Sequence, residues 1–223
     1  MKMVEICCLA NSRKLGGRCV AGVHLPTGRW LRPVSRNTNR ELEPRHYQLP
    51  LPWRETQVLD TIHLGLDARC PGCHHPEDWE MANVRWRLVQ RPASVAELRQ
   101  LRELLLPALY QENLLFGSAD DHVPYAVLKA APAPASLALI HPSRISWYIE
   151  AREEKRRYRA CFTYHGIYYD IGLTDQVWEQ RLEKLSPGNY SPGAAGLAVG
   201  SEIWLTVSLG DRLRVIVSSW QPR

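Results

Sequence analysis

The sequence has no apolar run of the roughly 18 residues needed to cross a bilayer, and Met1-Lys2-Met3-Val4-Glu5 leads straight into a strand-like pattern rather than a signal peptide. It also has no Walker loop, GxSxG, HExxH or dinucleotide-binding fingerprint. We therefore expect a cytoplasmic protein that does not contact membranes. The missing catalytic signatures favour a non-enzymatic role with no catalytic residues and no cofactor.

Cysteines are few and do not follow the spacing of a disulfide scaffold. There are six in 223 residues, and Cys7 and Cys8 are adjacent, so we expect reduced thiols. Cys70 and Cys73 form a CxxC pair beside His74 and His75, which is one half of a zinc-binding spacing. No second pair completes a tetrahedral site nearby. We predict no bound metal and leave a zinc site at this loop as the alternative.

Acidic residues are absent from positions 11 to 40, which contain seven Lys and Arg, although the whole chain carries only +5. Charge segregated in this way costs self-repulsion and favours an anionic partner, of which phosphate is the commonest. A solvated basic surface is the alternative. The core of this basic segment runs from Asn11 to Cys19 and contains Gly16-Gly17, which predicts a glycine-hinged loop.

Regular structure is predicted to be mainly β with a few helices (α+β). Residues 3–10, 18–25 and 30–34 alternate as three strands of a meander, and 56–66 and 84–89 are two further strands. Ser94 and Glu97 form a capping box ahead of leucines at helical spacing, which predicts a helix up to Leu105. Residues 107–135 are a poorly patterned connector. We expect an N-terminal β module at 1–92, a helical insert and connector at 93–135, and a C-terminal β module at 136–223.

The second half contains two hairpins whose pairing can be predicted. His165-Gly166 is a two-residue turn that pairs Tyr164 with Ile167, Phe162 with Tyr169 and Ala160 with Ile171. The last hairpin, with Gly210-Asp211-Arg212 as a three-residue loop, would place Leu209 opposite Leu213 and Val207 opposite Val215. Strands are also expected at 136–140 and 145–150, and a helix from 175 to 184 with Thr174 as its N-cap.

Several motifs resemble the dual OB-fold-containing domain of prokaryotes, a family often found in mobile or defence-associated gene settings. The motifs are Leu9 to Lys14 with Gly16 to Cys19, Trp30 to Ser35, His75 to Asp78, Tyr164 to Gly166, and Thr174-Asp175. Asp78 stands where the family usually has an amide residue. The resemblance implies two OB-like small β-barrels packed together and a role in binding nucleic acid or a nucleotide.

Our leading hypothesis is a non-enzymatic nucleic-acid-binding protein, with single-stranded or structured nucleic acid as its partner. The first module would bind through its basic loop, where cations contact phosphates and glycines allow close approach. The residues expected in this interface are Asn11, Ser12, Arg13, Lys14, Arg18, Arg29, Trp30 and Arg32. Trp30 would stack on a base, although packing in the core is the alternative for a large aromatic residue.

Two other functions are open. An enzyme or sensor for a small nucleotide would bring Asn11, Arg18, His75 and Glu77 together in a pocket between the modules. A protein-partner subunit of a defence complex would expose an apolar patch in place of a basic one. Arg152 to Arg159 is a secondary contact candidate whose internal Glu153 and Glu154 reduce its charge.

Overall fold

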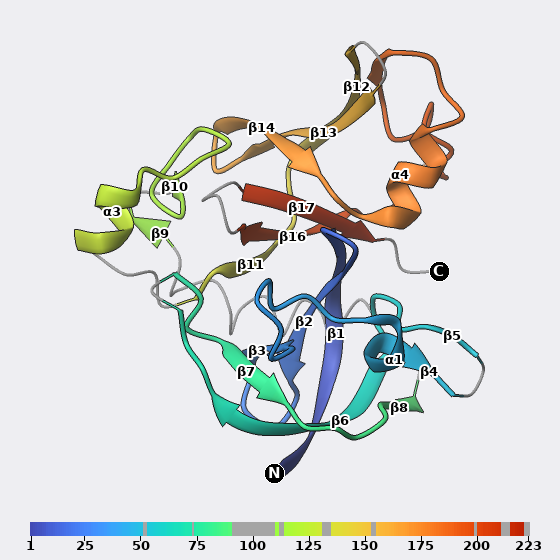
Figure 1. The fold of residues 1–223 in the computed structure, drawn as a ribbon. Helices are drawn as coiled ribbons and strands as arrows, with labels where there is room; N and C mark the ends of the chain where they lie inside the picture. Colours follow the sequence, from blue (N-terminus) through green and yellow to red (C-terminus); the bar gives the residue numbers. More distant parts are fainter. Residues whose placement is uncertain are drawn as a thin grey trace. The chain divides into compact units, whose positions relative to one another are not determined.

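The protein is mainly β with a few short helices, as the sequence predicts (Figure 1). The computed structural model describes residues 1–50, 53–72, 74–90, 110–111, 114–130, 135–152, 155–198, 200–210 and 215–220. The chain divides into two compact units, Met1–Leu105 and Leu106–Arg223. The helix predicted up to Leu105 lies outside the described residues, as does much of the 93–135 insert, so the predicted domain boundaries stay a prediction.

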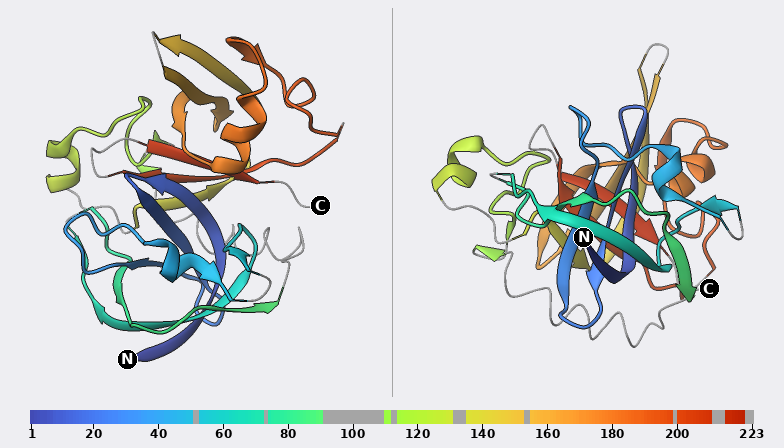
Figure 2. Two further views of the ribbon diagram at one scale, coloured as in Figure 1. Left: turned by 45° about the vertical axis from the view of Figure 1, so that its right-hand side comes forward. Right: turned by 60° about the horizontal axis from the view of Figure 1, so that its bottom comes forward.

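Unit 1 is a five-stranded barrel closed by its first strand. Its strands are β1 (Lys2–Lys14), β2 (Gly17–His24), β3 (Arg29–Val34), β6 (Thr61–Arg69) and β7 (Asp78–Met81). Strand β1 pairs with β2 through its second half and with β6 through its first half, while β3 pairs with β7 in parallel. The resulting order, β1-β2-β3-β7-β6 and back to β1, is that of an OB barrel. Figure 2 shows this barrel from two sides.

Alternation along the strands places one apolar row inside this barrel. Val4, Ile6 and Cys8 of β1 pack there with Ile62 and Leu64 of β6. The first three strands form the predicted meander. The fourth strand begins at Thr61 rather than at residue 56, and β7 occupies residues for which the sequence analysis predicted no strand. The remaining elements of this unit are β4 (Gln48–Leu49), β5 (Arg54–Glu55), β8 (Arg87–Gln90) and α1 (Pro44–Tyr47).

Unit 2 repeats the same strand order with its first strand broken in two. Its sheet runs β11 (Leu137–Ile140), β16 (Trp204–Leu209), β17 (Val215–Trp220), β14 (Ile167–Leu173), β13 (Lys155–Tyr164), β12 (Arg144–Arg152) and β15 (Gly188–Tyr190). β14 and β17 are the parallel pair, the counterpart of β3 and β7. β11 lies at one end of this order and β12 is next to the other end, but they are joined by only three residues, His141-Pro142-Ser143. Because Pro142 cannot donate a ladder hydrogen bond, the strand breaks there. β11 pairs with β16 and β12 pairs with β13, just as the two halves of β1 pair with β6 and β2.

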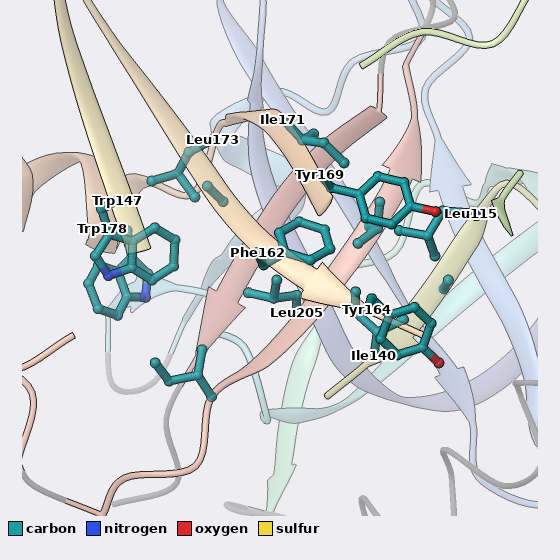
Figure 3. Close-up of a cluster of buried hydrophobic side chains, with 14 of the residues drawn as sticks. Leu115, Ile140, Trp147, Phe162, Tyr164, Tyr169, Ile171, Leu173, Trp178 and Leu205 are labelled. Atoms are coloured by element: carbon teal, nitrogen blue, oxygen red, sulfur yellow. Dashed lines mark hydrogen bonds between the residues drawn. The ribbon is translucent and has the colours of Figure 1, made fainter. Parts of the chain in front are cut away.

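Helix α4 (Gln176–Leu182) lies between β14 and β16 in the chain and covers one end of the unit 2 core. Trp178 of this helix lies against Trp147 of β12, with ring centroids 4.3 Å apart (Figure 3). Tyr169 stacks on Phe162, and its hydroxyl accepts a 2.9 Å hydrogen bond from the backbone of Leu115. That bond attaches β10 (Leu114–Leu115), which pairs with β9 (Tyr110–Gln111), to the barrel. The unit also contains α3 (Tyr125–Ala130).

The β13–β14 hairpin has the predicted pairing, with Tyr164 opposite Ile167 and Phe162 opposite Tyr169. The register predicted for the last hairpin is wrong, because Leu209 lies opposite Val215 and Val207 opposite Val217. Five residues, rather than three, separate the paired ends. The shift is by two residues along β17, an even number, so odd-numbered positions of the two strands still lie opposite each other.

The predicted N-cap of α4 is also wrong by one residue. The side chain of Asp175, not Thr174, accepts the hydrogen bond from the backbone N–H of Trp178, at 3.0 Å. Aspartate is as good an N-cap as threonine, so composition alone could not choose between these neighbours. Among the described residues, no helix has the length and apolar character that crossing a membrane requires.

Candidate nucleic-acid interface

The basic segment at residues 11–19 is the end of a β-hairpin rather than a loop. β1 runs on to Lys14, and Arg13 lies opposite Arg18 while Lys14 lies opposite Gly17. The turn is Leu15-Gly16, and Leu15 rather than a glycine takes the positive φ, 49°. Gly17 is required for another reason: a Cβ there would lie 2.2 Å from the carbonyl oxygen of Leu42.

The pairing divides the predicted contact residues between two faces. Asn11, Arg13 and Arg18 lie on one face of the hairpin, whereas Ser12 and Lys14 lie on the other. Arg13 is exposed and Lys14 is half-buried. Arg13 and Lys14 are therefore the cations at the tip, and they point to opposite sides of it.

Arg18 is held by partners from a distant segment. Its Nε and Nη2 donate to the carboxylate of Glu55 at 3.1 and 2.9 Å, and its guanidinium lies 5.2 Å from the centre of the Tyr47 ring. Its side chain is only 13% exposed. Asn11 on the same face donates from Nδ2 to the carbonyl of Thr56 at 2.7 Å. Both residues thus fix the hairpin against residues 47–56, and the charge of Arg18 is compensated.

Of the three interface residues expected on β3, two are buried and one is exposed. Trp30 is 7% exposed and Arg32 is 6% exposed, so the structure gives neither side chain the accessible surface that stacking on a base or contacting a phosphate requires. Arg29 is exposed, but it pairs with His24 where β2 ends and β3 begins. That position lies at the far end of β2 from Arg13 and Lys14.

Arg32 belongs to a buried chain of charged groups. Its Nε donates to Oδ1 of Asp78 at 2.5 Å and lies 4.0 Å from Oε1 of Glu77, and the same Glu77 oxygen is 4.0 Å from Nδ1 of His75. Burial opposes the charge on the guanidinium, but nearby Cys19 and Asp78 outweigh it and raise the pKa of Arg32 above its ordinary value. Arg40 donates to the second oxygen of Asp78 at 3.3 Å.

The sequence analysis missed Arg40, which compensates the carboxylate of Asp78. Its backbone has a φ of 59°, and its Nη1 also donates to the carbonyl of Cys70 at 3.1 Å. Neither hydrogen bond of Arg40 can be read from the sequence, because its partners Cys70 and Asp78 are 30 and 38 residues away.

The four residues proposed for a small-nucleotide pocket fall into two groups. His75 and Glu77 face Arg32, whereas Asn11 and Arg18 face Thr56 and Glu55. A polar cavity of about 270 Å³ does lie beside the buried charges. It is lined by Val34, Ser35, Arg36, Asn37, Arg40, Cys70 and Glu80.

A metal centre at the CxxC loop is not assembled by the part of the chain that the structure describes, which holds no group of three metal-binding side chains. Cys73 lies outside the described residues. Burial raises the pKa of Cys70 despite the opposing charge of Arg40, which favours its protonated thiol.

All of the net charge of the protein lies in unit 1. Residues 1–105 contain sixteen Lys and Arg against eleven Asp and Glu, which gives +5, whereas residues 106–223 contain twelve of each. A cationic OB barrel attached to a neutral one has the charge distribution expected when one barrel attracts a polyanion.

Comparison with known protein families supports the fold. The model of the dual OB-containing domain family matches residues 4–220. No curated protein sequence matches this chain. Similar solved structures include a murine DNA-binding protein bound to double-stranded DNA, at 11% identity and a TM-score of 0.31, covering 100% of this chain and 98% of that one. Another, described as the molecular basis for abrogation of activation of pro-inflammatory cytokines, has 8% identity and a TM-score of 0.30, with coverage of 100% and 93%. TM-scores this low carry no functional argument.

Proposed function

This chain belongs to the dual OB-containing domain family, and from that premise we propose that it binds nucleic acid through the β1–β2 hairpin of its first barrel. OB barrels bind oligonucleotides through the face of strands 2 and 3 and through the loops after strands 1 and 4. The hairpin tip is the loop after strand 1, and it presents Arg13 and Lys14 on the barrel that holds the net positive charge. That placement is the observation that carries the proposal.

The roles of the other hairpin residues follow from their contacts. Arg18 and Asn11 fix the hairpin to Glu55 and Thr56, so they position the tip rather than contact phosphate. Ser12 shares a face with Lys14 and can donate a hydrogen bond to the same strand of nucleic acid. We leave the buried Trp30 and Arg32 out of the interface, and Arg29, at the far end of β2, provides a separate contact at most.

The test is a salt titration of oligonucleotide binding by the full chain. Replacing both tip cations, as Arg13→Ala with Lys14→Ala, removes two phosphate contacts, so the slope of log K against log salt should fall by about 1.4 for a single strand. We expect affinity at low salt to fall about tenfold. Fluorescence anisotropy with labelled single-stranded DNA and RNA measures both quantities.

The matched control is Lys129→Ala with Lys184→Ala, which removes the same charge from exposed positions of unit 2. It should leave the slope unchanged. Equal slopes for the tip variant and the wild type would show that the hairpin does not contact phosphates. The protein-partner hypothesis stays a prediction. An apolar rather than a basic binding surface would distinguish it from nucleic-acid binding.

A further inference from the structure

The outward face of strands β12, β13 and β14 in unit 2 differs from the equivalent face of unit 1. These three strands correspond to strands 1, 2 and 3 of an OB barrel. In unit 1 the outward side chains of strands 2 and 3 include Val23 and Trp30, which are buried. In unit 2 the same face includes Tyr148, 38% exposed, and Tyr168, 63% exposed.

The strand register places the two tyrosines in separate rows, each with an arginine. One row across the strands is Arg144, Thr163 and Tyr168, and another is Tyr148, Arg159 and Gly172. We call these two rows, with Ser146, Cys161 and Asp170 between them, the tyrosine face. The two backbone positions lie roughly 16 Å apart, given about 3.3 Å per residue along a strand and about 4.8 Å between strands.

Tyr168 is exposed, and its hydroxyl has polar neighbours on β13 and β14. Its hydroxyl interacts with the thiol of Cys161, which donates to Oδ1 of Asp170 at 3.5 Å. Burial is the largest cause that raises the pKa of Cys161 to about 11, so this thiol is protonated at neutral pH.

Each tyrosine row of this face also contains an arginine. Arg159 is anchored in the face by Asp170, at 2.5 Å, and by Asp121, at 3.2 Å. Arg144 and Arg157 are exposed, and Glu150 lies opposite Arg157 in the strand register. The basic residues Lys155 and Arg157 continue along β13 toward the end of the hairpin, which is the counterpart of the unit 1 tip.

We propose that the tyrosine face binds single-stranded nucleic acid, with unpaired bases stacked on Tyr148 and Tyr168 and phosphates near Arg144 and Arg157. Two isolated rings separated by small polar residues do not form the contiguous apolar centre of a protein–protein interface. They do match the stacking platforms on which single strands bind, because each base offers a π-face and the neighbouring cations follow the backbone. A duplex cannot use them, since its bases are already stacked.

The test replaces the rings one at a time in the full chain. Tyr148→Leu and Tyr168→Leu keep an apolar side chain but remove the π-face, and each should weaken binding of a labelled single-stranded thymidine oligomer about tenfold. Because the rows lie far apart, the losses should multiply in the double variant. Tyr168→Phe keeps the ring and should bind within about twofold of the wild type.

Tyr125→Leu is the matched control, since Tyr125 is 55% exposed in the same unit but lies on α3. It should bind as the wild type does. Wild-type affinity in both Leu variants, or a blunt duplex that binds as tightly as the single strand, would overturn the proposal.

The salt dependence separates this inference from the proposed function, which it extends to a second site. The tyrosine variants should lose affinity at an unchanged salt slope, whereas the Arg13→Ala, Lys14→Ala variant should change the slope. If only one set of variants loses affinity, the site that this set probes is supported and the other site is rejected. A wild-type protein that binds no oligonucleotide rejects both.

Discussion

At the scale of single residues, the least replaceable charges of unit 1 are those of Arg32 and Asp78. Both side chains are almost fully buried, at 7% and 2% exposure, and their closest atoms are 2.5 Å apart. Removing one partner of such a pair leaves a buried charge without compensation. Their contribution is therefore to the stability of the barrel rather than to an accessible interface.

We predict that Arg32→Met lowers the free energy of unfolding by about 3 kcal/mol, because Asp78 then keeps only Arg40 as a cationic partner. Asp78→Asn should cost less, about 1 kcal/mol, since an amide oxygen still accepts the hydrogen bond from Arg32 and Glu77 stays as a carboxylate 4.0 Å from its Nε. Urea unfolding followed by tryptophan fluorescence measures both. Arg45→Ala, which removes a pair between Arg45 and Glu43 that is 70% and 45% exposed, is the control and should change stability by less than about 0.5 kcal/mol. An Arg32 variant as stable as this control would contradict the prediction.

At the scale of elements, α4 depends on one side-chain cap. Asp175 is 3% exposed and accepts from the N–H of Trp178, whose ring packs against Trp147 in the unit 2 core. The cap therefore fixes both the start of the helix and the position of a core residue. The hydroxyl of Thr174, in contrast, is buried without a hydrogen-bond partner in the described part of the chain.

We expect Asp175→Ala to lower the free energy of unfolding by about 1 to 2 kcal/mol through loss of the cap. Thr174→Ala should be close to neutral, because it removes a hydroxyl that makes no hydrogen bond. Thermal unfolding by circular dichroism compares the two neighbours directly. A larger loss in the Thr174 variant would restore the cap that the sequence analysis assigned.

At the scale of the whole molecule, two barrels of the same strand order differ in charge and in their outward faces. Unit 1 carries +5 and buries the outward side chains Val23 and Trp30, while unit 2 is neutral and exposes Tyr148 and Tyr168. The two proposed sites therefore rest on different interactions, electrostatic at the first barrel and stacking at the second.

A ligand that binds only the folded protein stabilises it by mass action. A single-stranded oligonucleotide at a hundredfold excess over its Kd should therefore add about 2.7 kcal/mol and raise the midpoint of thermal unfolding. High salt should reduce this rise, because counterion release weakens binding. Differential scanning fluorimetry at low and high salt checks both expectations. No rise at low salt would contradict nucleic-acid binding by either barrel.

Local pattern was enough to predict the meander, the β13–β14 register and the existence of α4. The sequence by itself determines these features because each depends on residues close in the chain: two turn residues and alternating side chains fix a hairpin, and a polar residue before an apolar helical face fixes a helix start. It could not choose between Thr174 and Asp175 or count the residues of the last turn, since neighbouring options satisfied the same pattern.

Only the tertiary structure decided which charges are available to a ligand. Arg18 and Glu55 are 37 residues apart, and Arg32 and Asp78 are 46 apart. Arg36 and Arg40 also pair with distant carboxylates, so the acid-free run from 11 to 40 gave no sign that four of its cations are compensated. Alternation places Tyr148 and Tyr168 outward, but their exposure depends on what covers the sheet. Ion pairs between distant segments, and the segments that cover a sheet, form only when the barrels close. They depend on burial of the whole core and not on a local preference of the chain.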